Sequence, residues 1–429
     1  MDIEHQKVNS KIFDSAKDIV ALASEMISVP SPTGQEGQMA EWLKKWLGSN
    51  GFEAKSFVID PEAMGKKYPR EFYRWTFPYS DRPNILGIKR GSGNGPSLMI
   101  NFHLDVVDAS PDKWSVDPWQ GTIKDEFLFG RGACDMKGGA AAALYAIKTI
   151  FDSGIALKGD ILIAGVIEEE GPGNGTFALQ ANGITADACI IPEPTDMALA
   201  IGVTGGIYGF INILGKSAHS STPWNGVNAL EKGYLLLNGI NKWRQERRKI
   251  PLDPLFMDEP ETPAAAHIID IKRTDDGLIG KIPSSVQLMV RSTVMPGEDP
   301  WDLADKFEKT LLAETSQDSW LAKKPPHFTW LRVGGRNYPA MLSEDHPLCK
   351  TLMDSYFRII GDAPKLIGLV SPADMQQLMV FEPATPTLMF GPGSIYTAHT
   401  DDEYVPIAEL AKVSAVIGNF ILNWCGVAN

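Results

Sequence analysis

Histidine and acidic side chains follow several apolar, strand-like runs of this chain. His103 ends the run SLMINFH, Glu170 and Glu193 follow two further runs, and His399 comes from a Gly/Pro-shaped loop after a fourth. Open α/β sheets bind ligands beyond the carboxyl ends of their strands, so these four side chains are expected to meet in one crevice. Imidazoles mixed with carboxylates are typical ligands of zinc, cobalt or manganese rather than magnesium or calcium. The pattern therefore predicts a site for zinc, cobalt or manganese.

Asp135 is a fifth candidate ligand. It stands between the turn GRGAC and the glycine-rich start of a predicted helix, KGGAAAALYAIK. Taken by itself, an aspartate at this place is more simply a helix N-cap. Beside the other four candidates, its carboxylate is the natural bridge between two ions, because two histidines and three carboxylates are enough for two metals when one carboxylate is shared.

Asp105 and the acidic run Glu168–Glu170 each have a metal-related interpretation and a simpler one. Asp105 follows His103 at a spacing that lets its carboxylate accept the second N–H of a metal-bound imidazole. A structural hydrogen bond between the two residues is the simpler interpretation. Three adjacent carboxylates repel one another, so a nearby cation would explain them if any are buried. A solvated acidic loop is the alternative.

The elements that must position these residues form two kinds of pattern. Strand-like runs at 84–89, 97–107, 160–167, 187–191 and 386–390 alternate with helical stretches, and two surface helices are expected within 12–50. This alternation predicts an α/β catalytic domain with a mostly parallel mixed sheet covered by helices. Between 205 and 335, alternating runs joined by polar turns predict an inserted α+β unit with an antiparallel sheet. The predicted domains are 1–204 together with 336–429, and 205–335.

The composition of the chain disfavours several classes of function. Its 429 residues exceed what one hydrophobic core usually organises. Its 53 acidic residues outnumber its 40 lysines and arginines, for a net charge of −13, which disfavours nucleic acid or an anionic membrane as a partner. No apolar run suits a spanning helix, the N-terminus lacks a signal-peptide pattern, and four scattered cysteines fit a reducing compartment. We expect a cytoplasmic protein that acts on a small molecule.

Several motifs together resemble the M20 metallopeptidase family, which includes acetylornithine deacetylase, succinyl-diaminopimelate desuccinylase, aminoacylase-1 and glutamate carboxypeptidases. The motifs are HLDVV, GRGACDMKGG, EEEGPGNGT, PEPT, GKSAHSS and AHTDDEYV, in the family's order. The resemblance implies two divalent metal ions per subunit, with zinc the first choice and cobalt or manganese the alternatives. It also implies Glu169 as the general base and Asp105 as the acid that orients a ligand. The implied ligands are His103, Asp135 and Glu193 for one ion, and Asp135, Glu170 and His399 for the other.

The same resemblance gives the inserted unit a role. It implies that 205–335 is the lid and dimerisation domain of a homodimer. His219, in GKSAHSS, would reach the partner subunit's site and donate to the oxyanion, although a histidine among serines is otherwise more typical of a surface. Arg291 would meet a substrate carboxylate, although a cross-strand ion pair explains it nearly as well.

Two departures from the family bear on the substrate. Phe102 replaces the glycine that many members have before the metal-binding histidine, so its ring lies either beside the ligand, as a candidate substrate contact, or in the core. Gly280 replaces a lid asparagine. The leading hypothesis is a hydrolase of the amide C–N bond in an N-acyl amino acid or small peptide. The two departures motivate the alternative, a hydrolytic deaminase of an unusual amine such as an aromatic one. The intact ligand set and Glu169 disfavour a third hypothesis, a binding protein without catalysis.

Overall fold

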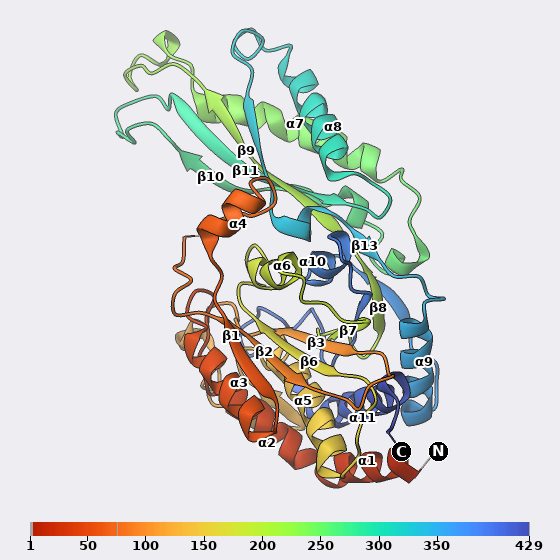
Figure 1. Ribbon diagram of the computed structural model, residues 1–429. Helices are drawn as coiled ribbons and strands as arrows, with labels where there is room; N and C mark the ends of the chain where they lie inside the picture. Colours follow the sequence, from red (N-terminus) through yellow and green to blue (C-terminus); the bar gives the residue numbers. More distant parts are fainter. Residues whose placement is uncertain (1–2, 75, 429) are drawn as a thin grey trace. The chain divides into compact units, whose positions relative to one another are not determined.

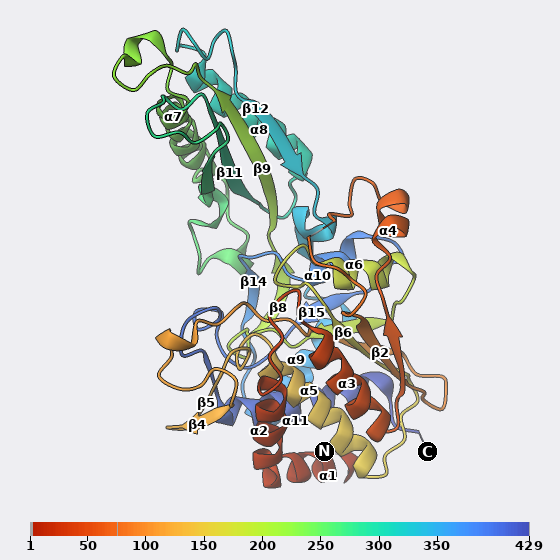
Figure 2. The ribbon, with the colours of Figure 1, turned by 90° about the vertical axis from the view of Figure 1, so that its left-hand side faces the viewer.

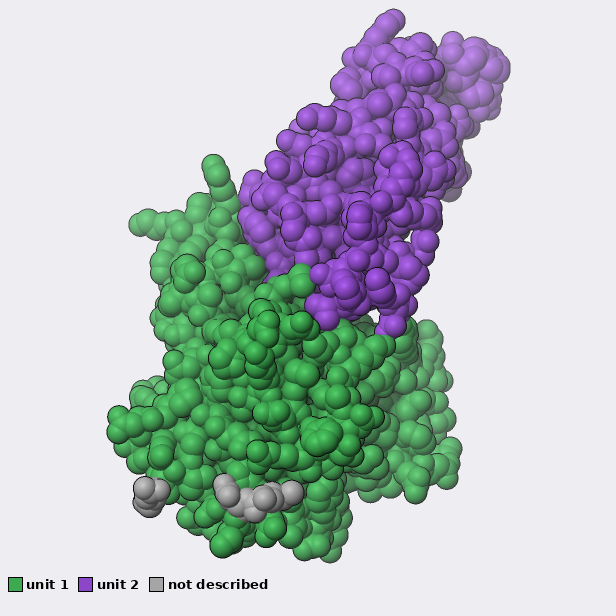
Figure 3. Space-filling view, turned by 90° about the vertical axis from the view of Figure 1, so that its right-hand side faces the viewer, with its two compact units in different colours: residues 1–202, 341–367, 373–429 green, residues 203–340, 368–372 purple. Residues whose placement is uncertain are grey.

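The computed structural model describes residues 3–74 and 76–428 and divides the chain into two compact units (Figure 3). The first comprises the described parts of Met1–Gly202, Met341–Ile367 and Ala373–Asn429. The second comprises Val203–Ala340 and Gly368–Pro372. The sequence pattern, which predicts 205–335 for the inserted unit, does not reveal that Gly368–Pro372 belongs to it.

The first unit is built on a mixed sheet whose central strands run parallel (Figure 1). The strand order is β1-β2-β6-β3-β7-β15-β8-β13, with β14 beside β8. Strands β6, β3, β7 and β15 are parallel. At the flanks, β2 pairs antiparallel with β6, β8 pairs antiparallel with β15, and β1 pairs antiparallel with β2. The bounds are β1 Glu53–Phe57, β2 Asn84–Lys89, β3 Leu98–His103, β6 Ile161–Val166, β7 Ala188–Ile191, β8 Leu199–Val203, β13 Ala340–Met341, β14 Leu366–Leu369 and β15 Thr387–Met389. The predicted α/β class with a mostly parallel sheet is confirmed.

Helices cover both faces of this sheet, which is why β3 and β7 are buried along their whole length and are mostly apolar. Figure 1 shows α6 and α10 on one side and α5 and α11 on the other. Helix α2 packs against α5, and α11 packs against α1, α5 and α9 (Figure 2). The bounds are α1 Ile3–Asp14, α2 Ala16–Ile27, α3 Gly37–Ser49, α4 Pro61–Lys67, α5 Lys137–Asp152, α6 Asn174–Ala181, α9 Pro347–Ile360, α10 Met375–Val380 and α11 Ile407–Cys425. Helix α1 precedes the two helices that the sequence predicts, and it buries Val8 and Ile12.

Helix α5 is buried over most of its length, and its run of alanines suits both a helix and close packing. Its first turn comes especially close to the loop after β7. A Cβ on Gly139 would lie 2.0 Å from the carbonyl oxygen of Pro192, so the approach requires a glycine. The start of α5, preceded by Asp135, and the end of β7, followed by Glu193, are therefore neighbours.

The second unit contains an antiparallel sheet of strand order β10-β11-β9-β12, as the sequence predicts. Helices α7 and α8 cover one of its faces (Figures 1 and 2). Apolar residues that alternate along the strands, such as Ile211 and Leu288, pack there against Phe307 of α8. The bounds are β9 Gly205–Leu214, α7 Ala229–Arg247, β10 Ala266–Arg273, β11 Ser285–Val294, α8 Pro300–Thr315 and β12 His327–Leu331.

The remaining elements are short. A three-stranded sheet has the order β16-β5-β4, with bounds β4 Thr122–Lys124, β5 Phe127–Phe129 and β16 Tyr404–Pro406. Single 3₁₀ turns lie at Pro111–Lys113, Pro223–Asn225, Pro254–Phe256, Thr262–Ala264 and Gly334–Asn337. Within the described residues, no helix combines the length and the apolar character needed to cross a membrane.

Candidate metal centre

Each of the four adjacent parallel strands ends near a candidate ligand. His103 is the last residue of β3, Glu170 follows β6, Glu193 follows β7, and the loop after β15 carries His399. Because the strands are parallel neighbours, their carboxyl ends meet at one edge of the sheet. The turn before α5 brings Asp135 to the same edge.

The carboxylate of Asp135 lies between the two histidines. Its Oδ1 is 2.9 Å from Nε2 of His103, and its Oδ2 is 3.2 Å from Nε2 of His399. Nε2 of His399 also lies 2.9 Å from the carboxylate of Glu170, and Nε2 of His103 lies 4.0 Å from that of Glu193. The structure thus brings all five candidate ligands together.

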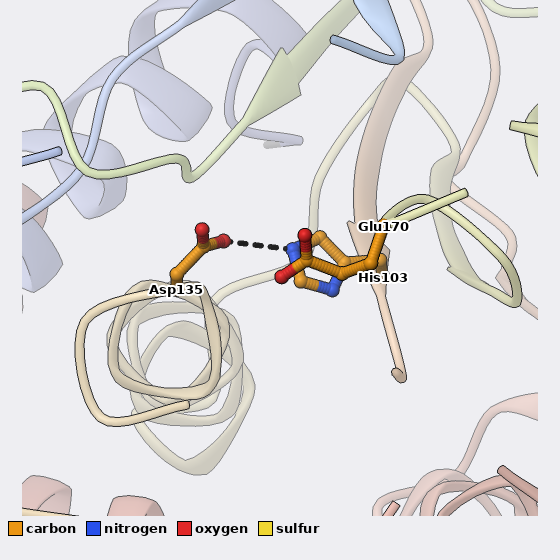
Figure 4. A group of neighbouring side chains, drawn as sticks. All are labelled: His103, Asp135 and Glu170. Atoms are coloured by element: carbon orange, nitrogen blue, oxygen red, sulfur yellow. Dashed lines mark hydrogen bonds and ion pairs between the residues drawn. The ribbon is translucent and has the colours of Figure 1, made fainter. Parts of the chain in front are cut away.

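This set of donor atoms fits two metal ions. Ligand atoms of His103, Asp135 and Glu170 all lie within 4.8 Å of one another (Figure 4). One oxygen of Asp135 faces each imidazole, which is the arrangement of a carboxylate shared between two ions. The site is accessible on one side, since the side chain of His399 is 50% exposed while the others are nearly buried.

Negative charge is crowded into this buried site. Burial, with the charge of Asp135, raises the pKa of Glu170 to about 7 and that of Glu193 well above its usual value. Hydrogen bonds to Asp135 and Glu170 raise the pKa of His399 to about 10. Burial lowers the pKa of His103, but its hydrogen bond to Asp135 and the neighbouring charges outweigh burial and raise it. Divalent ions would compete with protons for these side chains and would therefore bind more tightly as the pH rises.

The carboxylate of Asp105 does not form the predicted hydrogen bond with His103 in this structure. Its distance to Nδ1 of His103 is 3.9 Å, whereas the backbone carbonyl oxygen of Asp105 lies only 2.7 Å from this nitrogen. Donation by Nδ1–H to that carbonyl leaves Nε2 as the ligand atom. The carboxylate instead accepts the backbone N–H groups of Glu169 and Glu170, both at 3.1 Å, and the hydroxyl of Thr33 at 3.0 Å. Because β3 ends at His103, the strand alternation behind the prediction does not reach Asp105.

Glu169 lies beside the ligand cluster. Its backbone N–H is held by Asp105, and the residue is 8% exposed. After burial and Asp135, the charge of Glu169 also contributes to the raised pKa of Glu170 and Glu193. A carboxylate at this place can exchange a proton with a molecule bound at the cluster.

One prediction from the sequence is corrected, and one alternative that it left open is excluded. Phe102 is fully buried in β3, where strand alternation points its ring away from the face that carries His103, so it belongs to the core and not to a substrate pocket. Asp135 is not a helix N-cap, because Met136 holds that position and α5 has no side-chain cap. Its carboxylate faces the imidazoles instead.

His219 and Arg291 belong to the second unit. His219 is exposed, and its Nδ1 accepts the backbone N–H of Ser221 at 3.1 Å, so the proton of the neutral imidazole lies on Nε2. Arg291 lies on β11 opposite Tyr208 of β9 and donates to its hydroxyl at 3.3 Å. Among the described residues, the cross-strand partner of Arg291 is therefore a tyrosine hydroxyl and not a carboxylate.

Glu403, the residue that binds the backbone of Asp135, was not identified from the sequence. Glu403 is buried, and its Oε1 accepts the backbone N–H groups of Cys134 and Asp135, both at 2.9 Å. Its Oε2 accepts from Arg131 at 2.6 Å. Because Glu403 follows His399 closely in sequence, it ties together the two loops that carry these ligands. In the sequence, Glu403 and Arg131 are single charges within the motifs AHTDDEYV and GRG, and their spacing does not indicate that they form an ion pair.

Comparisons with known proteins identify the family to which the chain belongs. The model of Peptidase family M20/M25/M40 matches residues 99–423. N-formyl-4-amino-5-aminomethyl-2-methylpyrimidine deformylase of Bacillus subtilis (strain 168) is 27% identical over 447 residues, 99% of each chain. Acetylornithine deacetylase of Proteus mirabilis (strain HI4320) is 26% identical over 414 residues, 95% of this chain and 96% of that one. Human carnosine dipeptidase 1 shares the fold, with a TM-score of 0.74 at 16% identity over 98% of both chains. Since the family model spans most of the chain, the chain belongs to Peptidase family M20/M25/M40, a family of metal-dependent hydrolases that act on C–N bonds.

Proposed function

We propose that the chain uses two divalent metal ions to hydrolyse the amide C–N bond of a small N-acyl compound. The observation that carries the proposal is the carboxylate of Asp135, which has one oxygen directed to each imidazole. N-acyl amino acids and small peptides are the first candidate substrates. The name of the Bacillus subtilis relative adds N-formyl derivatives of heteroaromatic amines. Zinc is the first choice of metal, with cobalt or manganese the alternatives.

The residues of the metal centre would have different roles in hydrolysis. His103, Asp135 and Glu193 would hold one ion, and Asp135, Glu170 and His399 the other. When bound, the ions would lower the pKa of water and polarise the substrate carbonyl. Glu169 would take the proton of the attacking water and return it to the leaving nitrogen. Asp105, which accepts the backbone N–H of Glu169, would hold this base beside the ligand cluster.

The alternative activity, hydrolytic deamination, loses one of its two supports. Phe102 lies in the core, so its ring does not indicate an aromatic substrate. Gly280, exposed in the second unit, does not by itself favour an amine over an amide. The products separate the two reactions, because amide hydrolysis releases an amine and an acid, whereas deamination releases ammonia.

Chelated protein is expected to lose turnover and to regain it with zinc, cobalt or manganese, since the attacking water needs a Lewis acid. The assay is a screen of formyl, acetyl and succinyl derivatives of amino acids and aromatic amines, together with dipeptides, that detects both free amine and ammonia. Full activity in protein shown to be metal-free by elemental analysis would contradict the proposal. Ammonia as the only nitrogen product would replace it with the deaminase.

A homodimer formed through the second unit is also part of the proposal. Strand β10 is an edge of the antiparallel sheet and exposes Ile269 and Ile271. Tyr234 of α7 is exposed beside it, and a groove of about 390 Å³ lies between the helix and the strand. An exposed apolar edge strand is a surface for pairing with another chain, and two copies of one strand can pair around a two-fold axis.

Following the family resemblance, we further propose that His219 acts in the reaction of the partner subunit. Its Nε2–H is a donor that could stabilise the developing oxyanion, while Arg291 would meet a substrate carboxylate. His219→Ala should lower kcat by about 10²- to 10³-fold and leave the metal content unchanged. In heterodimers of Glu169→Gln and His219→Ala subunits, one site has both residues intact if the histidine comes from the partner, so activity should reappear. Verified heterodimers without activity would place His219 in its own subunit's reaction or outside it.

We place the enzyme in the cytoplasm, with small molecules rather than nucleic acid or membrane as its substrates. All four cysteines are free and buried, as expected of a reducing compartment. The net charge of −13 disfavours binding to phosphate-rich surfaces.

A further inference from the structure

The three adjacent acids Glu168–Glu170 are separated by the structure into two groups. Glu169 and Glu170 belong to the metal centre, whereas Glu168 is fully buried and bonded to other side chains. The carboxylate of Glu168 accepts hydrogen bonds from Nη2 of Arg82 at 2.6 Å, from the hydroxyl of Tyr79 at 3.0 Å and from Nδ2 of Asn174 at 3.1 Å. The repulsion that the sequence suggests is relieved here by a guanidinium.

Arg82 joins Glu168 to a second buried acid. Its Nη1 lies 3.0 Å from both carboxylate oxygens of Glu36, the residue before α3, and its Nε donates to the carbonyl of Pro78 at 2.7 Å. Arg82 itself is 3% exposed and lies over the ring of Tyr79. One guanidinium therefore compensates two buried carboxylates, and without it both would be left unpaired in a medium where charge is costly.

The backbone at Glu168 shows why this compensation matters for its neighbours. Glu168 has φ of 62°, in the left-handed region that residues other than glycine rarely adopt. Such a conformation persists where surrounding contacts fix it, and the three donors on the carboxylate supply those contacts. Changing the φ of Glu168 would redirect Glu169 and Glu170, which follow it immediately.

The other side of the same segment is also anchored. Asp105 accepts the backbone N–H groups of Glu169 and Glu170, and Thr33 donates to the same carboxylate. Thr33 and Glu36 both belong to the turn SPTGQEG between α2 and α3. This turn therefore contacts both anchors of the acidic segment, Asp105 through Thr33 and Arg82 through Glu36.

We propose that Arg82 is a positioning residue of the metal centre: by holding Glu168 in a buried, left-handed conformation, it fixes the directions in which Glu169 and Glu170 enter the site. The roles of these two acids rest on the proposed function. Arg82 acts through the backbone of Glu168 and makes no contact with the ligand atoms among the described residues.

The test compares Arg82→Met and Arg82→Lys with a matched control, Arg74→Met. Arg74 lies in the same segment, but its side chain is 62% exposed and pairs with Glu62 on the surface. The first measurement is amide hydrogen exchange of residues 167–174 in metal-free protein. The second is titration of each protein with Zn²⁺, and the third is kcat and KM on a substrate found in the screen.

Arg82→Met should speed exchange at Glu169 and Glu170, weaken one of two Zn²⁺ affinities by about 10- to 100-fold and lower kcat more than KM rises. Arg82→Lys keeps the positive charge but lacks the planar guanidinium with its several N–H donors, so it should give smaller effects in the same direction. It serves as the test if Arg82→Met does not fold. Arg74→Met should match the wild type in all three measurements. Wild-type exchange and Zn²⁺ affinity in a folded Arg82 variant would overturn the proposal. Absence of Zn²⁺ binding by the wild type would instead overturn the proposed function.

Discussion

Asp135→Asn is expected to remove both metal ions and to abolish turnover. In the wild type, one oxygen of Asp135 faces His103 and the other faces His399. An amide presents only one oxygen and carries no charge, so it cannot be shared between two cations. Without the ions, the pKa of water stays far above neutrality instead of falling to about 7, so turnover should fall by several orders of magnitude.

Metal content distinguishes a shared ligand from an ordinary one. His103→Ala and His399→Ala should each weaken the binding of a single ion, because each imidazole faces only one side of Asp135. Asp135→Asn should weaken both, as measured by elemental analysis and Zn²⁺ titration. Thermal unfolding of the three metal-free variants shows whether each is folded. A folded Asp135→Asn that holds one ion with wild-type affinity would show that the carboxylate is not shared.

The fold could be predicted from the sequence where hydrophobic periodicity is decisive. Buried strands such as β3 and β7 are mostly apolar runs, and the alternation in β9 and β11 marks a sheet with one covered face. The predicted run 97–107 was too long because the apolar pattern continues through Leu104 and Val106 after the strand ends at His103. These residues are buried in the loop that carries Asp105, and periodicity does not separate a buried loop from a strand.

The part of the candidate site that could be predicted from the sequence is the set of ligands that follow the parallel strands. Parallel strands bring their carboxyl ends together, so the proximity of His103, Glu193 and His399 follows from topology. The residues that position these ligands cannot be predicted in this way, because Arg82 and Glu403 contact segments that are distant in the sequence. The same limit applies to Asp105, whose backbone and carboxylate roles depend on where a strand ends.

Glu169→Gln should lower kcat by roughly 10²- to 10⁴-fold, the usual contribution of a positioned general base. The glutamine side chain is similar in size and can keep the same place, but an amide cannot accept the proton of the attacking water. The backbone N–H that Asp105 holds is unchanged by the substitution. Metal content should therefore remain close to that of the wild type, and KM should change much less than kcat.

Glu169→Asp is the matched variant, since it keeps a carboxylate but withdraws it by one methylene from its place beside Glu170 and Glu193. Its kcat should fall between those of the wild type and Glu169→Gln, because proton transfer depends on distance as well as on the presence of a base. Comparable kcat values for wild type and Glu169→Gln, with both ions bound, would assign proton transfer to another group. Glu168 would be a poor replacement, because its carboxylate is fully buried and bound by Arg82, Tyr79 and Asn174.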